Sequence, residues 1–236
     1  AFGPVVTVFA MNKVIEKAAQ VGVCWGIIRN TTHQGAMGYY VLMATQEDMA
    51  GIASVCSPPN MAPFGAKAAG LHNSPISIAV PGKDLGPLIL DMAGGILGFN
   101  EEQFAANPSP FFKSFGLSNI IQVLGGAVAG IYLDHCTQGP WIANQGAFIA
   151  VFDTAHLMPE GQVQAQVDQY VGDARKMHPV PGTERAELTG GNEWALEREN
   201  RERGIPLGDE HRQMLETAAE ETGVESPFGQ YEDTRL

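Results

Sequence analysis

One histidine stands in a setting where it could move a proton. His33 lies in the polar segment 29–35, after the apolar run 23–28 and before a second run with helical spacing. An imidazole titrates near neutral pH, so a histidine that reaches a cleft from such a turn can give or take a proton. A capping or structural histidine would have the same local sequence. Both interpretations stay open on local grounds.

Two further charged residues could belong to a site. We expect Lys113 just ahead of a helix that begins near Phe115. There, the backbone N–H groups and the helix dipole would add to its charge and favour an anion. Asp91 ends an apolar run. The simpler interpretations are an exposed lysine at a helix start and a hydrogen-bonded carboxylate at a strand end.

Familiar catalytic motifs do not occur. The sequence has no G-x-G-x-x-G loop after a strand, no Walker loop, no H-E-x-x-H and no G-x-S-x-G. A dinucleotide site of the Rossmann type is therefore not predicted. Cys24, Cys56 and Cys136 have apolar neighbours, which indicates buried thiols in a reducing compartment rather than disulfides. No metal site is expected.

The elements that must position these residues follow from apolar periodicity. Helical spacing predicts helices at residues 5–20, 36–46, 115–132, 162–176, 192–203 and 209–222. Short apolar runs predict strands at residues 23–28, 51–56, 76–80, 88–92 and 147–152. The turn at 81–84 suits an antiparallel hairpin between the third and fourth strands. Alternating helices and strands indicate a mixed α/β domain.

Composition limits the partners. The chain has 236 residues, 44% of them hydrophobic, and a formal charge of −12. Residues 1–150 carry −2 and residues 151–236 carry −10. Such acidity makes nucleic acid and anionic membrane surfaces poor partners. The longest apolar run, 120–133, is broken by glycines and predicts a core helix. No charged-then-apolar leader opens the chain, and we expect a cytoplasmic protein.

Several short blocks, taken in order, resemble one family. Around His33, residues 22–40 are similar to a signature in which a strand ends in Arg/Lys-Asn-Ser, followed by one residue and then His-x-Gly. Further blocks match at residues 63–65, 73–82, 90–93, 113–117, 144–146, 181–184 and 203–207. Together they resemble the type-2 malate/L-lactate dehydrogenase family, whose members include malate, L-sulfolactate and ureidoglycolate dehydrogenases, diketogulonate reductase and Δ1-piperideine-2-carboxylate reductase.

The resemblance implies a fold. It is an α/β (α+β) fold of the family's own non-Rossmann NAD(P)-binding type, with a mainly antiparallel sheet flanked by helices and a helical C-terminal part, in a tight homodimer. We expect three segments: 1–57 with the histidine motif, 58–160 with the cofactor-binding sheet and a buried helix, and 161–236, helical and packing back on the core. One continuous domain is the alternative.

The resemblance also implies an activity. The chain would transfer a hydride between the nicotinamide of NAD or NADP and a small 2-hydroxy, 2-oxo or cyclic imino acid, with His33 exchanging the alcohol proton. Lys113 would meet the pyrophosphate or the adenosine phosphate. The positions that match cofactor-holding residues of the family are Ser57, Met92, Ala93, Gly94, Lys113, Gly182, Thr183 and Glu184.

Two departures keep other functions open. In the family, residues ahead of those matched here bring a second histidine, a serine and a substrate-binding arginine, whereas Arg29 is the only arginine before residue 175. Between Met92 and Lys113 the family has a longer stretch with a double glycine before the lysine. The alternatives are a family scaffold repurposed for non-redox catalysis or binding, and a non-catalytic subunit that completes another protein's fold.

Overall fold

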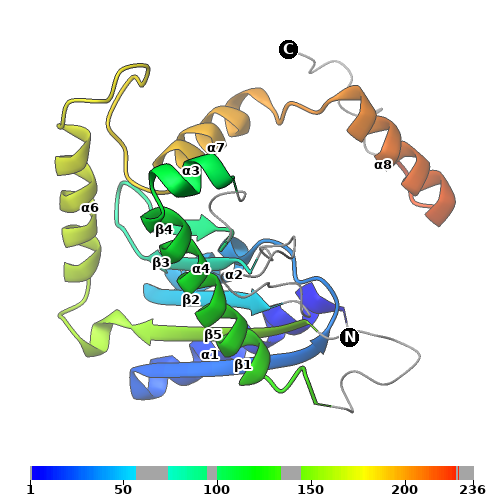
Figure 1. Cartoon of the computed structure of the whole chain (residues 1–236), viewed down its shortest axis with the longest axis horizontal. Helices are drawn as coiled ribbons and strands as arrows, with labels where there is room; N and C mark the ends of the chain where they lie inside the picture. Colours follow the sequence, from blue (N-terminus) through cyan, green and yellow to red (C-terminus); the bar gives the residue numbers. More distant parts are fainter. Residues whose placement is uncertain (1, 57–73, 95–99, 134–144, 227, 229–236) are drawn as a thin grey trace. The chain divides into compact units, whose positions relative to one another are not determined.

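The computed structural model describes residues 2–56, 74–94, 100–133, 145–226 and 228 (Figure 1). By their internal contacts the residues form two compact units, Ala1–Gly190 and Gly191–Leu236. The first unit holds the sheet and the site described below, and each unit is described by itself. Strands from the predicted segments 1–57 and 58–160 share one sheet in the first unit.

Five antiparallel strands form an open sheet in the order β1-β5-β2-β3-β4. Their bounds are β1 (Val23–Thr31), β2 (Met49–Cys56), β3 (Ile76–Val80), β4 (Leu88–Met92) and β5 (Gln145–Asp153). Every paired neighbour is antiparallel, and β3 and β4 form the predicted hairpin. The mainly antiparallel sheet expected from the sequence is therefore confirmed. β5 lies between β1 and β2 and contributes the buried side chains of Ile149 and Val151.

Helices cover the two faces of this sheet (Figure 1). On one face lie α1 (Gly3–Val21) and α2 (Met37–Thr45). Gly51 of β2 lets α2 approach, because a Cβ there would lie 3.1 Å from Ala44 Cβ and 3.2 Å from Val41 Cα. On the other face lie α4 (Ser109–Gln122) and the π-helix η1 (Val123–Ala127).

The start of α4 corrects the sequence analysis. The helix begins at Ser109 rather than near Phe115, so Lys113 lies inside it and not ahead of it. Pro110 explains the difference, because proline fits the first turn of a helix, where no backbone N–H is needed. The predicted anion site at the helix start thus does not coincide with Lys113. The Pro-Ser-Pro run at residues 108–110 spans the start of the helix, and its prolines do not by themselves predict a helix.

Beyond Gln122 the helix widens into η1, which ends at Ala127, so the predicted helix 115–132 is also wrong at its C-terminal end. The small residues of η1 permit close packing, as predicted. A Cβ on Gly126 would lie 2.7 Å from Cys56 Sγ. Cys56 is buried, and this burial raises the pKa of its thiol to about 11, although the Tyr132 hydroxyl nearby opposes the shift. A thiol with so high a pKa stays protonated and unreactive at neutral pH. Cys24 is half-buried and Cys136 lies outside the described residues.

Three shorter or more peripheral elements are seen in the other described parts of the first unit. They are α3 (Glu101–Ala106), the 3₁₀ turn η2 (Thr154–His156) and α6 (Gln162–Arg175). Asp168 of α6 accepts hydrogen bonds from the backbone N–H groups of Lys83, Asp84 and Leu85, at 3.0, 2.6 and 3.4 Å. This carboxylate therefore ties α6 to the hairpin turn between β3 and β4.

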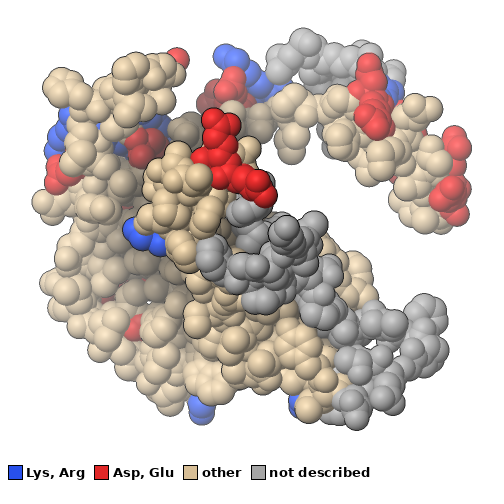
Figure 2. Space-filling model, viewed as in Figure 1, with Lys and Arg blue, Asp and Glu red and all other residues tan. Residues whose placement is uncertain are grey.

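The second unit consists of α7 (Gly191–Arg203) and α8 (Asp209–Thr222). Gly204 and Gly223 follow these helices with φ of 90° and 69°, as the predicted stop signals require. Acidic side chains gather on α8 and, in the first unit, on α3 (Figure 2). Across the described ranges, no helix is both long and apolar enough to cross a membrane.

Candidate active site

A pocket of about 410 Å³ lies where the end of β1, the start of α2 and the end of β4 meet. It is lined by His33, Gln34, Gly35, Ala36, Met37, Val55, Pro75, Asp91, Met92, Ala93 and Gln145. Three of the predicted site residues, His33, Met92 and Ala93, therefore come together in one place. These residues are distant in the sequence, and they meet because the end of β4 contacts α2, where the Asp91 carboxylate accepts a hydrogen bond from the Gly38 N–H.

A β-bulge near the end of β1 directs the following residues toward this pocket. The pairing of β1 with β5 shifts register between Ile28 and Thr31, and Asn30 between them has a φ of 57°. Asparagine tolerates this left-handed conformation better than most residues, and such bulges often re-aim side chains beside sites. The strand runs to Thr31, so the predicted turn at 29–35 begins later than expected. After the bulge the chain leaves the sheet and presents residues 32–35.

The loop that follows is held by buried hydrogen bonds. The Gln34 side chain donates to Thr31 Oγ1 at 2.9 Å and lies 3.0 Å from the Thr7 hydroxyl of α1. The Gln34 carbonyl accepts from the Tyr40 hydroxyl of α2. These four side chains are each at most 2% exposed. The backbone on the C-terminal side of His33 is therefore anchored to α1, β1 and α2.

His33 itself is exposed toward the pocket. Its Nδ1 accepts a hydrogen bond from the Gly35 backbone N–H at 3.1 Å. Because an accepting ring nitrogen carries no proton, the neutral imidazole in this arrangement has its proton on Nε2. Nε2 is thus left as the nitrogen that can donate to a ligand oxygen in the pocket.

Asp91 faces the same pocket from the end of β4. Its Oδ2 accepts a hydrogen bond from the Gly38 N–H, in the first turn of α2, at 3.0 Å. A Cβ on Gly38 would lie 2.4 Å from that oxygen, so a larger residue there would displace the Asp91 carboxylate. Partial burial raises the pKa of Asp91, and the Gly38 hydrogen bond opposes that shift. The sequence predicted a hydrogen-bonded strand-end carboxylate, and its place in the pocket comes from the fold.

Gly94 follows the end of β4 and is closely packed against Ser74 and Ser118. Its N–H donates to the Ser74 carbonyl at 3.0 Å, and its carbonyl accepts from Ser114 Oγ at 2.8 Å. A Cβ on Gly94 would lie 2.5 Å from Ser118 Oγ. Gly94 is buried and does not line the pocket, so its role in the structure is to fix the course of the chain after Met92 and Ala93.

Among the described residues, Lys113 and the predicted turn at 182–184 do not line this pocket. Lys113 is exposed on α4, and residues 182–184 form an exposed turn in which Thr183 N–H and Oγ1 bond the Val180 carbonyl at 3.1 and 2.8 Å. Ser57 lies outside the described residues. Pro75, Val55 and Gln145 line the pocket without having been predicted as site residues. The only signal for Gln145 and Pro75 was their place inside family-like blocks.

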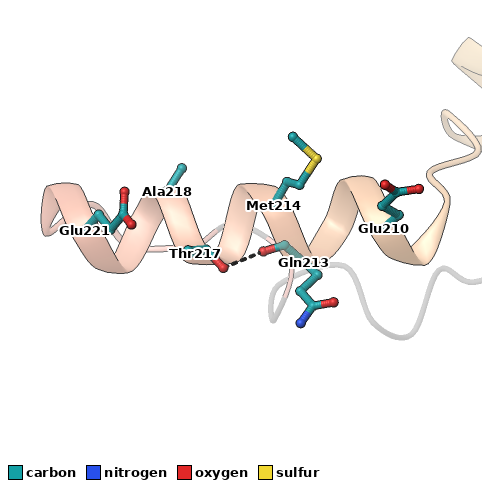
Figure 3. Close-up of a pocket in the computed structure, with 6 residues that line it drawn as sticks. All are labelled: Glu210, Gln213, Met214, Thr217, Ala218 and Glu221. Carbon is teal, nitrogen blue, oxygen red and sulfur yellow. Dashed lines mark hydrogen bonds between the residues drawn. The ribbon is translucent and has the colours of Figure 1, made fainter.

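A second hollow runs along α8 (Figure 3). It is lined by Glu210, Gln213, Met214, Thr217, Ala218 and Glu221, all from one helix face. The Thr217 hydroxyl bonds the Gln213 carbonyl within the helix at 3.0 Å, as Figure 3 shows. A groove made by one helix brings no groups together from separate elements. We therefore take the His33 pocket as the candidate active site.

The chain is similar in sequence to known proteins of one family. The family model described as malate/L-lactate dehydrogenase matches residues 1–107 and 94–216. A malate dehydrogenase from Pyrococcus horikoshii is 28% identical over an alignment 265 positions long, which covers 94% of this chain and 73% of that protein. An L-sulfolactate dehydrogenase from Methanocaldococcus jannaschii is 30% identical over 222 residues, covering 77% of this chain and 62% of the relative.

Solved structures show the same fold. The malate dehydrogenase from Pyrococcus horikoshii superposes with a TM-score of 0.81, covering 96% of this chain and 73% of that one at 28% identity. A malate dehydrogenase from Entamoeba histolytica, at 19% identity, gives a TM-score of 0.82 and supports the fold alone. The chain therefore belongs to the malate/L-lactate dehydrogenase family, NAD(P)-dependent oxidoreductases that act on hydroxy acids.

Proposed function

We propose that this chain transfers a hydride between the nicotinamide of NAD or NADP and a small 2-hydroxy or 2-oxo acid, or a cyclic imino acid, in the His33 pocket. One observation carries the proposal. A histidine whose Nδ1 is engaged by Gly35 shares a pocket of about 410 Å³ with the largely apolar strand end at Met92 and Ala93. Proton exchange and a flat apolar surface are what this chemistry requires of a protein.

The pocket residues fit a nicotinamide ring. The volume of about 410 Å³ lies within the range of small-ligand pockets, roughly 300–1,000 Å³. Pro75, Met92 and Ala93 offer an apolar surface for the ring, and Gly94 supports that surface from behind. The bound nicotinamide would supply the hydride acceptor or donor. Lys113, Ser57 and the turn at 182–184 are proposed for the phosphate and adenosine parts of the cofactor.

His33 is proposed to exchange the substrate proton. In the neutral ring Nε2 bears the proton, because Nδ1 accepts from Gly35, and Nε2–H can hydrogen-bond to the oxygen of a 2-oxo substrate. To give that oxygen a proton, the ring must start as the imidazolium, protonated on both nitrogens. To take the proton of a 2-hydroxy substrate, the ring must start neutral with its lone pair on Nε2. In both directions Nδ1 carries a proton during the transfer and releases the Gly35 N–H, so the Gly35 contact orients the ring in its resting state.

Asp91 is proposed to keep the two sides of the pocket together. Its bond to the Gly38 N–H joins the end of β4, which carries Met92, to the start of α2, which follows His33. The distance between the proton-exchanging ring and the apolar strand end then depends on this contact. Positioning of this kind contributes strongly to rates, because reacting atoms must meet within a narrow range of distances.

A homodimer is proposed as the working form. Val5 and Phe9 of α1 are 64% and 65% exposed, and Trp25 of β1 is 62% exposed. Apolar side chains exposed on adjoining elements of this kind are typical of protein interfaces. Size analysis in solution tests the dimer, and a monomer at high protein concentration would contradict it. The expected cytoplasmic location stays a prediction.

The activity is tested with the purified chain, NAD or NADP, and a panel that includes malate, lactate, sulfolactate and a cyclic imino acid. Reduced nicotinamide should appear or disappear with at least one substrate, and one cofactor should raise the melting temperature at millimolar concentration. If neither cofactor shifts the melting temperature and no substrate turns over, the proposal is wrong. The repurposed scaffold would then be the better account.

A further inference from the structure

A buried threonine of α1 is connected to the His33 loop although it does not line the pocket. The Thr7 hydroxyl lies 3.0 Å from Gln34 Oε1 and 2.8 Å from the Gly3 carbonyl oxygen. Thr7 is fully buried, and Gln34 is 1% exposed. The hydroxyl has a single proton, so the two acceptors share it. The bond from the Thr7 hydroxyl to the Gly3 carbonyl is a common contact within a helix. The bond to Gln34, 27 positions away in the sequence, is a tertiary contact.

Gln34 uses both ends of its amide. Its Oε1 faces the Thr7 hydroxyl, and its Nε2 donates to Thr31 Oγ1, which in turn donates to the Gln145 carbonyl at 3.2 Å. A glutamine fits because it offers an acceptor and a donor at the same distance from the backbone. The family-like signature, His-x-Gly, leaves this position unspecified. The network therefore depends on this chain's own residues.

The His33 side chain has few constraints of its own. The ring is exposed, and its one hydrogen bond within the described ranges comes from the Gly35 N–H. That N–H belongs to the peptide that follows Gln34. The orientation of the Gln34–Gly35 peptide consequently decides whether Nδ1 of His33 has a donor.

The start of α1 also contacts this loop closely, at Thr32 and His33. The Gly3 N–H donates to Thr32 Oγ1 at 3.0 Å, and a Cβ on Gly3 would lie 2.4 Å from the His33 carbonyl oxygen. Gly3 and Thr7 lie one helical turn apart, so one face of α1 supports the residues on both sides of His33.

We propose that Thr7 and Gln34 are positioning residues for His33. Together with the bond from the Tyr40 hydroxyl to the Gln34 carbonyl, their hydrogen bonds hold the Gln34–Gly35 peptide so that its N–H meets His33 Nδ1, which keeps the resting neutral ring in the form protonated at Nε2. The catalytic consequence rests on the proposed function, whereas the effect on the ring does not. Side-chain NMR of isotope-labelled histidines therefore tests the network even in a protein without turnover.

The experiment compares Thr7→Val, which replaces the hydroxyl by a methyl group, with Thr7→Ser, which keeps the hydroxyl. In Thr7→Val the ring-nitrogen signals of His33, identified by their loss in His33→Ala, should move from the Nε2–H form toward a mixture of both forms. Because the loop that carries the ring loses part of its support, the turnover number should fall between about tenfold and 100-fold with the cofactor KM unchanged. Thr7→Ser should restore the ring signals and most of the turnover.

Thr222→Val is the matched control. The Thr222 hydroxyl bonds the Ala218 carbonyl at 2.7 Å, the same helical contact that Thr7 makes with Gly3, but it has no partner in the His33 loop. This variant should leave the ring signals and turnover as they are. Gln34→Met, with a side chain of similar length, gives a second disruption of the network if Thr7→Val fails to fold.

Two results would overturn the proposal. One is a folded Thr7→Val or Gln34→Met protein whose His33 ring signals equal those of the wild type, whatever its turnover. The other is a shift of the ring signals in Thr7→Val that Thr7→Ser shows to the same extent. If the wild type itself turns over no substrate, the proposed function fails, and the NMR comparison still decides whether the network positions the ring.

Discussion

The loop around His33 and the turn at residues 181–184 have similarly polar sequences, but the structure holds them differently. Gln34 and Thr31, beside His33, are at most 1% exposed and bond to α1, α2 and β5. In the turn, residues 181–184 are all exposed, and both the N–H and the hydroxyl of Thr183 donate to the nearby Val180 carbonyl. The His33 loop therefore presents an exposed side chain from a backbone anchored by buried hydrogen bonds to other elements, whereas the turn at 181–184 is held by hydrogen bonds within itself.

The difference separates two kinds of contribution to a site. A group that must exchange a proton in a fixed geometry needs rigid support, because small displacements cost large factors in rate. A group that only adds to the binding of a long cofactor tolerates more freedom. We therefore expect substitutions at the His33 loop to change turnover, and substitutions at the exposed positions to change cofactor affinity.

The largest effect should come from His33→Ala. Loss of the proton-exchanging group should lower the turnover number about 100- to 10,000-fold with little change in cofactor affinity. Glu184→Ala, in the exposed turn, is the comparison, and its turnover should stay within about twofold of the wild type. Steady-state kinetics of both variants decide the matter. Equal losses in the two variants would remove the distinction between the loops.

Next comes Gly3→Ala, which disturbs the support of the His33 loop without touching the pocket lining. The added Cβ would lie 2.4 Å from the His33 carbonyl oxygen and 2.6 Å from the Thr32 carbonyl oxygen, and neither backbone atom can move alone. We expect a loss of about 1–3 kcal/mol in the free energy of unfolding, together with reduced turnover.

Gly172→Ala is its matched control. Gly172 lies in α6, and a Cβ there meets nothing within 4 Å. That variant should gain up to about 1 kcal/mol, because alanine favours a helix more than glycine does. Urea unfolding measures both variants. A Gly3→Ala protein as stable as the wild type would show that the start of α1 does not constrain the loop.

A smaller effect on stability is expected at Glu187, which follows the exposed turn and forms ion pairs with two arginines. Arg175 Nε lies 2.9 and 3.0 Å from its two oxygens, and Arg185 lies 2.7 Å away. Burial favours a higher pKa for Glu187, but the hydrogen bond and charge of Arg175, the charge of Arg185 and the Leu188 N–H outweigh it. The pKa of Glu187 therefore lies below its usual value.

A lowered pKa gives stability that is present above the unfolded-state pKa and is lost as the pH falls through the folded-state value. Glu187→Gln should thus cost about 1–2 kcal/mol of unfolding free energy at neutral pH, and much less in acid. The control is Glu199→Gln, whose exposed pair with Arg203 should contribute little at any pH. A cost at Glu187 that does not change with pH would refute the assignment.

The smallest effect should come from Lys113→Ala. The side chain is exposed on α4, so a contact with a cofactor phosphate would be screened by solvent. The cofactor KM should rise only about two- to fivefold, with the turnover number unchanged, as expected for uniform binding. A large fall in turnover would place Lys113 in the reaction itself and not at the phosphates.

Much of the fold could be predicted, since local signals agreed with the final elements. The hairpin strands Ile76–Val80 and Leu88–Met92 occur at the predicted residues, because prolines and glycines bound two short apolar runs. α8 also has its predicted bounds, Asp209–Thr222, with Gly223 as its stop. The predicted start of α4 near Phe115 was wrong, because the helix begins at Ser109 with Pro110 in its first turn.

The site was only partly predictable, for a physical reason. His33 has a local signal, whereas Asp91 reaches the pocket through a hydrogen bond to Gly38, 53 residues away in the sequence. Thr7 likewise meets Gln34 only because α1 packs beside the end of β1. Contacts of this kind depend on the sheet order and on which face each helix covers, and neither property follows from spacing along the chain.

The central claim is that the nicotinamide ring binds beside His33, and chemical protection tests it most directly. Diethyl pyrocarbonate modifies accessible histidines, and mass spectrometry of peptides gives the rate for each one. His33 and His211 are both exposed, and His211 lies in α8, so it serves as the internal reference. Saturating NADH or NADPH should slow the modification of His33 several-fold and leave His211 unchanged. An unchanged rate at His33 while the cofactor is bound would contradict the account.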